Sequence, residues 1–425
     1  MGQDFRGAWF STVANIDWPS PEAVGHTQMQ KQEMLTLLDQ MQALGMNAVI
    51  FQVRPTADAF YPSSLEPWSA WLTGKQGQNN DIPYDPLAMM VTEAHKRGME
   101  VHAWVNPYRV TLPVTNIKDV APDHIYCRHP EWFWKYNNQW YFEPGLDETR
   151  EWLCKVVADI VRRYDIDAIH MDDYFYPYPD HKTDFPDHAC FKANPRGFDN
   201  IKDWRRNNVN MAIRQLHDTI KAIKPHVEFG ISPFGIWRNQ QSDPVYGSAT
   251  SGLQNYDDLY ADVRLWMQEG WIDYVVPQLY WAIGSKAADH KTLAHWWAKN
   301  CFQTKLYIGM AAYQLADPKR MPKDEYQRKK STAWAKPNEL SRQMALHREI
   351  PEIKGSAFFS LHHLLENPLG ICDSLRKTAV VDTFRVPNFI PIVSPVPLLQ
   401  VDKLPGMESL REQETSTNNE VLLSW

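Results

Sequence analysis

The stretch AIHMDDYFY at residues 168–176 decides how the rest of the sequence is interpreted. Four residues of strand length, apolar apart from one histidine, are followed at once by two adjacent carboxylates and then by a run of aromatic residues. A strand that is apolar on both faces and turns polar only where it ends is typical of a closed parallel barrel, because the working loops of such barrels follow the carboxyl ends of the strands. The segment therefore predicts a barrel strand with a functional site at its end.

Outward from this segment, similar apolar runs alternate with helical stretches to about residue 380. Strands are predicted at 7–12, 48–53, 100–105, 168–171, 228–232, 274–278, 305–309 and 355–360. Helices are predicted at 28–44, 86–97, 149–164, 204–223, 259–269, 292–299, 338–348 and 367–377. Eight such units predict a (β/α)8 TIM barrel over residues 5–380. An open doubly wound sheet is the competing architecture, but residues 10–14 lack its glycine-rich phosphate turn.

The sequence changes character after residue 384. Residues 385–397 carry four prolines among apolar residues, which predicts an extended Pro-rich linker. Residues 398–425 end in an alternating segment that is typical of the second strand of a β-sandwich, although an isolated hairpin is barely stable in water. We therefore expect residues 398–425 to begin a fibronectin-like β module that continues in the natural protein. A C-terminal tail lying across the barrel is the alternative.

Composition excludes several classes of protein. The 425 residues carry a formal charge of −7, which argues against a general nucleic-acid binder, and the chain lacks the run of about 18 apolar residues that a transmembrane helix needs. The five cysteines are scattered without a CxxC pair, so we expect neither a disulfide framework nor a zinc knuckle. Aromatic residues reach 12% of the chain, with 18 tryptophans. Their flat faces suit sugar rings as well as they suit a large core.

The adjacent carboxylates of Asp172 and Asp173 are the strongest candidates for chemistry. Neighbours on a strand point to opposite faces, so one of the two faces the barrel mouth directly, and His170 shares the face of Asp172. A carboxyl group that is surrounded by aromatic rings can act as an acid, a base or a nucleophile. Its pKa depends on its burial and on the neighbouring groups. The alternative is that the pair only caps a turn or binds an arginine. We expect His170 to hydrogen-bond a catalytic carboxylate.

The ends of the other predicted strands supply amides, hydroxyls and guanidinium groups beside aromatic rings. A sugar site needs this combination, because rings stack on the sugar faces and polar groups bind the hydroxyls. A salt bridge at the barrel rim is the commoner role for any single arginine, so the prediction depends on several strand ends together. The candidate substrate-binding residues are Arg54, His102, Trp104, Asn106, Tyr108, Arg109, His170, Tyr174, Tyr176, Trp237, Arg238, Gln278, Tyr280 and Trp281.

Glycoside hydrolysis ordinarily needs a second carboxyl group, about 5–5.5 Å from the first for retention of configuration and about 6.5–9.5 Å for inversion. Asp58 and Glu143 are the candidates for this second catalytic role, with Asp58 preferred. Glu66 and Asp257 are less favoured.

A metal site is the main chemical rival. His102, His170 and Asp172 are of the right types to share one ion. Barrel metallohydrolases usually carry a His-x-His pair on the first strand, and residues 7–12 contain none. We therefore expect neither a metal nor another cofactor.

At these strand ends the sequence resembles a known family. The matching segments are RGAWF at 6–10, QVRP at 52–55 with Asp58, HAW at 102–104, NPYR at 106–109, HMDDY at 170–174, SPFGIWR at 232–238 and PQLYW at 277–281. They resemble the glycosyl-hydrolase-like family 10 proteins over about residues 5–380. The resemblance implies a (β/α)8 barrel that acts on a glycan, export to the cell envelope, often as a lipoprotein, and a fibronectin-like domain after the barrel. One branch of this family cleaves peptidoglycan strands stripped of their stem peptides.

The resemblance supplies no mechanism. The true family 10 xylanases use a glutamate after the fourth strand and a second one at the seventh strand. Here the fourth strand offers Asp172 and Asp173, and residues 306–313 of the seventh contain no acid. A chitinase-like Asp-x-Asp-x-Glu pattern also fails, because Tyr174 occupies the place of the glutamate.

We therefore expect an exported glycoside hydrolase of the periplasm or the outer-membrane-attached envelope, with denuded peptidoglycan as the favoured substrate. The first residues lack the basic and apolar segments of a secretory leader, so the protein is either cytosolic or its leader has been removed. We expect removal, with a lipid anchor through that leader. The alternative is a non-catalytic glycan-binding envelope protein, and a metal-dependent deacetylase is a third hypothesis.

Overall fold

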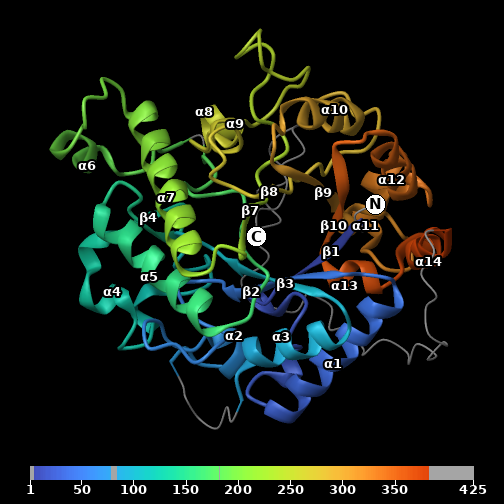
Figure 1. Cartoon of the computed structure of the whole chain (residues 1–425), viewed down its shortest axis with the longest axis horizontal. Helices are drawn as coiled ribbons and strands as arrows, with labels where there is room; N and C mark the ends of the chain where they lie inside the picture. Colours follow the sequence, from blue (N-terminus) through green and yellow to red (C-terminus); the bar gives the residue numbers. More distant parts are fainter. Residues whose placement is uncertain (1–3, 78–83, 181, 382–425) are drawn as a thin grey trace.

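The computed structural model describes residues 4–77, 84–180 and 182–381, and eight parallel strands form a closed barrel at its centre (Figure 1). The strands are β1 (Phe5–Phe10), β2 (Ala48–Arg54), β3 (Glu100–Val105), β6 (Ala168–Met171), β7 (Glu228–Ile231), β8 (Tyr274–Val275), β9 (Lys305–Ala311) and β10 (Ile353–Phe359). They pair in chain order, and β10 closes the barrel by pairing with β1. The predicted (β/α)8 barrel is confirmed.

Burial on both faces explains why the strands are nearly continuous apolar runs. All seven residues of β2 are buried, because its inner face meets the barrel interior and its outer face meets the helices. The predicted bounds agree with the structure to within a few residues at six of the eight strands and exactly at β3 and β6. The strand predicted at 274–278 is shorter, since only Tyr274 and Val275 pair regularly and Gln278 makes isolated bridges.

Helices surround the barrel and form its outer layer (Figure 1). The longer ones are α1 (Thr27–Ala43), α3 (Pro86–Lys96), α5 (Asp147–Arg163), α7 (Ile201–Ile223), α10 (His290–Asn300), α12 (Glu339–Glu349) and α14 (Ile371–Val381). The shorter helices are α2 (Ala70–Thr73), α4 (Ile125–Arg128), α6 (His188–Ala193), α8 (Asn255–Asp258), α9 (Val263–Gln268), α11 (Lys323–Lys329) and α13 (Leu361–Leu365). None of the helices within the described ranges is long and apolar enough to cross a membrane.

A β-hairpin that the sequence analysis did not predict lies between β3 and α5. It consists of β4 (Phe133–Tyr136) and β5 (Gln139–Phe142), joined by Asn137 and Asn138, which both adopt positive φ angles. Asparagine tolerates this conformation and favours such two-residue turns. The hairpin holds the loop after β3, because Phe142 N–H donates to Tyr108 O at 2.9 Å. It therefore helps to fix a loop that carries several candidate site residues.

The C-terminal predictions lie outside the described residues. The Pro-rich linker at 385–397 and the β module at 398–425 both follow the last described residue, Val381. The last helix of the described residues is α14, and the predicted boundary at 380 stays a prediction.

A chain of hydrogen bonds fills the barrel interior below the mouth. The indole N–H of Trp9 donates to His170 Nε2 at 3.2 Å, so the His170 proton is on Nδ1 and faces the Tyr274 hydroxyl at 2.9 Å. That hydroxyl in turn lies 2.8 Å from Nδ1 of His102. The expectation that His170 bonds a catalytic carboxylate is wrong, because both of its nitrogens are used inside the core. Burial lowers the pKa of His170 well below its ordinary value, so it remains neutral.

The Tyr274 ring reaches the barrel interior because the neighbouring position on β7 is a glycine. A Cβ atom at Gly230 would lie about 2 Å from three Tyr274 ring carbons. We predict that Gly230→Ala lowers the free energy of unfolding by about 3 kcal/mol, since the ring has no free space into which to move. Urea unfolding of the variant measures this loss. Because Tyr274→Ala removes the clash, the double variant should be more stable than the sum of the two single losses predicts, and simple additivity would contradict the explanation.

Candidate active site

Asp172 and Asp173 are the first two residues after β6, at the carboxyl end of the barrel. Their side chains are almost fully buried, with exposures of 4% and 5%. The ends of β2, β3, β7 and β8 bring other polar residues to the same rim, because the carboxyl ends of parallel strands lie together. The sequence prediction of two acids at the mouth of the barrel therefore agrees with the structure.

A short hydrogen-bonded chain fixes the environment of Asp172. The backbone N–H groups of Thr12 and Val13 both donate to Gln52 Oε1 at 2.9 Å, which fixes the orientation of that amide. Gln52 Nε2 then donates to Asn106 Oδ1 at 2.6 Å, so Asn106 presents its NH2 group to Asp172 Oδ2. The backbone N–H groups of the two residues that follow β1 therefore determine the orientation of Asn106 through Gln52. In this orientation Asn106 can only donate a hydrogen bond to Asp172.

Asp173 is held by a different set of donors. The hydroxyl of Tyr178 donates to Asp173 Oδ2, and the side chain of Gln278 also hydrogen-bonds this carboxyl. Gln278 is itself oriented by the Ser232 carbonyl, to which its Nε2 donates at 3.0 Å. Residues from the ends of β6, β7 and β8 therefore position this second carboxyl group.

Arg109 supplies positive charge to both acids. Its Nε donates to Pro55 O at 3.1 Å and its Nη1 donates to the hydroxyl of Tyr174. The guanidinium lies close enough to lower the pKa of Asp172 and that of Asp173, which partly offsets the opposing effect of burial.

Burial and mutual repulsion separate the protonation states of the two acids. Burial raises the pKa of Asp172 far above its ordinary value, and the negative charge of Asp173 raises it further. Burial also raises the pKa of Asp173, but less, because Tyr178 and Gln278 donate hydrogen bonds to its charged form. At neutral pH the pair therefore holds one proton, on Asp172, beside an ionised Asp173.

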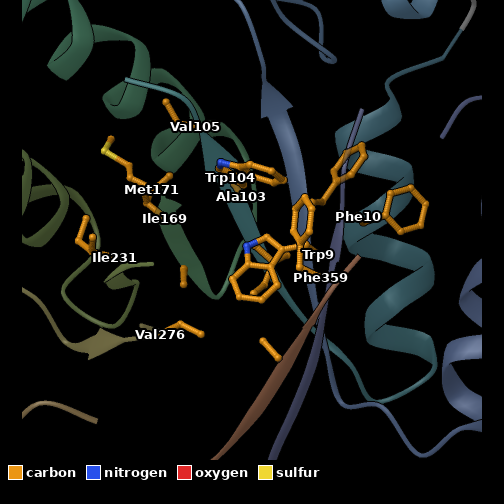
Figure 2. Close-up of a cluster of buried hydrophobic side chains, with 14 of the residues drawn as sticks. Trp9, Phe10, Ala103, Trp104, Val105, Ile169, Met171, Ile231, Val276 and Phe359 are labelled. Carbon is orange, nitrogen blue, oxygen red and sulfur yellow. The ribbon is translucent and has the colours of Figure 1, made fainter. Parts of the chain in front are cut away.

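Aromatic rings connect the barrel interior with this pair. Figure 2 shows Trp9 and Phe359 close together, with Trp104 on β3, while Phe10 lies on the opposite face of β1. The Trp9 and Phe359 ring centres are 6.0 Å apart, and Phe359 is 6.2 Å from the ring of Tyr280. Asp173 contributes to raising the pKa of Tyr280, and the Trp104 indole lowers that of Asp172, so these two rings lie near the acids. They offer apolar faces to a sugar.

Several buried polar atoms at this rim have no partner within the described residues. They are Asp172 Oδ1, Trp104 Nε1, Arg109 Nη2 and Ser232 Oγ, although the Trp104 indole comes close enough to Asp172 to lower the pKa of this acid. Buried polar atoms without partners are rare in proteins. Their concentration around two acids indicates a site that binds a polar ligand.

The two candidates for a second catalytic carboxyl group bond to other partners. Asp58 accepts hydrogen bonds from Thr56 and Gln76, and burial raises its pKa to about 6. Glu143, at the base of the hairpin, accepts from Trp134 Nε1 at 2.6 Å and Gly145 N at 2.7 Å. Burial raises its pKa to about 7. The acid whose charge acts most strongly on Asp172 is Asp173.

Other predicted substrate-binding residues are occupied by structural contacts. Arg54 forms a buried ion pair with Glu66 through two hydrogen bonds of 2.6 and 2.7 Å. Arg238 bonds Asp257 at 2.8 Å, so the less favoured acids Glu66 and Asp257 act as partners of arginines.

Further predicted residues pack within loops or the core. Trp237 stacks on Trp296, Trp281 packs edge-on against Phe234, Tyr176 packs against Phe185 and Tyr260, Tyr108 packs against Phe142, and His102 lies inside the barrel. The structure thus brings Trp104, Asn106, Arg109, Tyr174, Gln278 and Tyr280 to the acid pair.

The predicted metal rival has no geometric support in the described part of the chain. His102 and His170 are hydrogen-bonded through the Tyr274 hydroxyl rather than to Asp172. Across residues 4–77, 84–180 and 182–381, no group of three or more His, Cys, Asp or Glu side chains is arranged to hold an ion.

The sequence analysis missed two residues that position the acids. Gln52 is a polar residue inside an otherwise apolar strand, and a buried amide in such a strand is a signal that it has a specific partner. Tyr178 belongs to the aromatic run after Asp173, but nothing in the sequence distinguishes it from Tyr174 and Tyr176, since the path of the loop decides which hydroxyl reaches the acid.

Known proteins resemble this chain in sequence and in fold. "Glycosyl hydrolase YngK" of Bacillus subtilis is 48% identical over 392 residues, which cover 92% of this chain and 73% of that protein. "Glycosyl hydrolase DigH" of Escherichia coli K12 is 39% identical over 386 residues, covering 85% of this chain and 84% of that protein.

Two solved structures share the fold at low sequence identity. The glycoside hydrolase domain of PgaB (BpsB) from Bordetella bronchiseptica has a TM-score of 0.52 at 13% identity, covering 88% of this chain and 98% of that one. The catalytic domain of a β-amylase from Paenibacillus polymyxa has a TM-score of 0.53 at 10% identity, covering 91% and 100%. The family model described as "Glycosyl hydrolase-like 10" matches residues 4–327. The chain therefore belongs to the glycosyl hydrolase-like 10 family.

Proposed function

We propose that this protein is a glycoside hydrolase in which Asp172 is the general acid, and that its substrate is the glycan strand of peptidoglycan without stem peptides. The observation that carries the proposal is the buried pair of Asp172 and Asp173 at the barrel mouth. Family membership and the relatives named as glycosyl hydrolases support a glycosidase. The narrower substrate is supported by the resemblance to a branch that cleaves such strands.

The chemistry follows from the different protonation of the two acids. A protonated Asp172 can give its proton to the glycosidic oxygen as the bond to the leaving sugar breaks, and the ionised Asp173 can stabilise the positive charge that develops on the sugar. Asn106 holds Asp172 in place throughout. The rings of Trp104 and Tyr280 supply faces on which sugar rings stack.

We also propose that the protein acts in the cell envelope, exported and lipid-anchored through a leader. Support for this location comes from the family resemblance and from the nature of the substrate. Fractionation of the native host and detection of the protein with the membranes would test it.

We predict that Asp172→Asn lowers the rate of glycan cleavage about 10³-fold, because an amide cannot donate the proton. Release of sugars from peptidoglycan strands pretreated with an amidase, followed by mass spectrometry, measures this. Glycan binding should persist in the variant. Asp262→Asn, which changes a half-buried acid that caps α9, is the matched control and should keep near wild-type activity. Full activity of Asp172→Asn would remove this residue from the mechanism, and binding without cleavage in the wild type would favour a glycan-binding protein.

The same variant makes a prediction about stability. The pKa of Asp172 is raised in the folded protein, so its contribution to stability is present at low pH and is lost as pH rises through the folded-state pKa. Asp172→Asn has no such loss. It should therefore become more stable than the wild type as pH rises from 5 to 9, by about 1 kcal/mol or more. Thermal unfolding across this range measures the difference, and parallel stability curves would contradict the raised pKa.

Asn106→Ala should lower kcat about 10–100-fold with a smaller change in KM, because it removes the hydrogen bond that holds Asp172. Without this donor the ionised form of Asp172 is less stable, so the alkaline limb of the pH–rate profile should move to higher pH. Asn300→Ala removes a comparable amide in α10 and serves as the control. An unchanged alkaline limb in Asn106→Ala would show that Asn106 does not act through Asp172.

A further inference from the structure

The two acids that the described residues bring to the barrel mouth are neighbours in the chain. A retaining glycosidase places its nucleophile and its acid on opposite sides of the bond that breaks, about 5–5.5 Å apart. Asp172 and Asp173 both follow the end of β6, and the charge of Asp173 acts on Asp172. Because both acids belong to one strand end, we assign them to one wall of the site, from which one cannot attack the anomeric carbon opposite the other.

The other buried acids of the described residues form hydrogen bonds or ion pairs with groups of the protein. Each accepts at least one hydrogen bond or forms an ion pair: Asp58 with Thr56 and Gln76, Glu66 with Arg54, Glu143 with Trp134, Asp187 with Arg205, Asp317 with Lys319 N–H, and Glu339 with Ile283 N–H. The half-buried Asp17, at the end of β1, accepts from Ser11 N–H, Ser360 and His362 N–H.

We propose that the substrate supplies the nucleophile: the carbonyl oxygen of its own 2-acetamido group attacks the anomeric carbon, with Asp172 as the acid and Asp173 as the acceptor of the acetamido N–H. This inference rests on the proposed function, and it specifies the substrate class. The enzyme requires a 2-acetamido sugar at the cleaved bond. Because the attack comes from the face opposite the leaving group, the cleaved linkage is β in the gluco series.

The step balances with the groups present. The acetamido oxygen forms a bond to C1 while the bond from C1 to the glycosidic oxygen breaks, and the leaving oxygen takes the Asp172 proton. The amide proton passes to, or is held by, the Asp173 carboxylate, which leaves an oxazoline on the sugar. Water then adds to C1 and gives a proton to the Asp172 carboxylate, and the oxazoline opens as its nitrogen regains a proton. The configuration at C1 is retained, and both acids return to their starting states.

The surroundings of Asp173 suit the task of binding an amide. The Tyr178 hydroxyl occupies Oδ2, and Gln278 fixes the carboxyl further, so the group is rigid and ionised when the N–H arrives. Tyr280 lies near the same carboxyl and offers an apolar face for the acetyl methyl group. The Trp104 indole N–H faces Asp172 and lowers the pKa of this acid, so it lies beside the group that donates the proton.

Chemical change of the acetamido group tests the proposal. Peptidoglycan strands freed of stem peptides are N-deacetylated and then either N-acetylated again or N-trifluoroacetylated, which weakens the carbonyl oxygen as a nucleophile. The wild-type protein should cleave the re-acetylated strands normally and the deacetylated and trifluoroacetylated strands at least about 100-fold more slowly. Proton NMR of the first product should show retention of configuration.

Binding of a transition-state mimic provides a readout that is independent of turnover. N-acetylglucosamine thiazoline, a stable mimic of the oxazoline, should bind the wild-type protein in calorimetry, and Asp173→Ala should weaken this binding at least tenfold while Asp262→Asn leaves it unchanged. Equal cleavage of deacetylated strands, or inversion, with Asp172 still required, would overturn this inference and leave the proposed function intact. No cleavage of any strand, with or without thiazoline binding, would overturn both.

Discussion

The site depends on the burial of two adjacent carboxyl groups in one place. Removing a carboxylate from water is costly, and two like charges side by side increase the cost, so the pair can exist only with one proton shared between them and with donors on the charged member. Tyr178 and Gln278 stabilise Asp173, and Arg109 supplies the opposite charge to both acids. This unequal support makes Asp172 a proton donor and Asp173 an anion at neutral pH. The proposed acid, the charged partner and the requirement for an amide on the substrate all follow from it.

The barrel fixes this arrangement from below and from the sides. The interior is filled by Trp9, His170 and Tyr274, whose hydrogen bonds are made with one another and not with the acids. The histidine is therefore part of the support for β6 rather than part of the chemistry. On the side of β2 and β3, the chain from Gln52 to Asn106 reaches Asp172 and begins at two backbone amides, which cannot rotate away. Rigid groups of this kind are what a preorganised site requires.

Much of the fold could be predicted from the sequence, because strands buried on both faces are apolar until they end and the eight repeats of this pattern leave few alternatives. The position of Asp172 and Asp173 followed from the same pattern. The hairpin β4–β5 was not predicted, although Asn137-Asn138 between two aromatic segments is a turn signal. It is an insertion between a barrel strand and its helix, and the prediction used only the regular alternation of strands and helices. The assignment of Arg54 to the substrate failed for another reason. Nothing in the sequence shows that the loop carrying Glu66 folds back onto this guanidinium. Side-chain partners from distant loops are decided by tertiary packing.

The protonation of the pair can be observed directly. Carbon NMR of the protein with labelled aspartate carboxyl groups, assigned with Asp172→Asn and Asp173→Asn, follows each carboxyl group from pH 3 to pH 10. We expect Asp172 to remain protonated at pH 7 and to titrate well above the ordinary value of 3.8, with Asp173 ionised at the same pH. In Asp173→Asn, where the neighbouring charge is absent, the pKa of Asp172 should fall. Two independent titrations near pH 4 would contradict the account, because the site would then hold no proton to give.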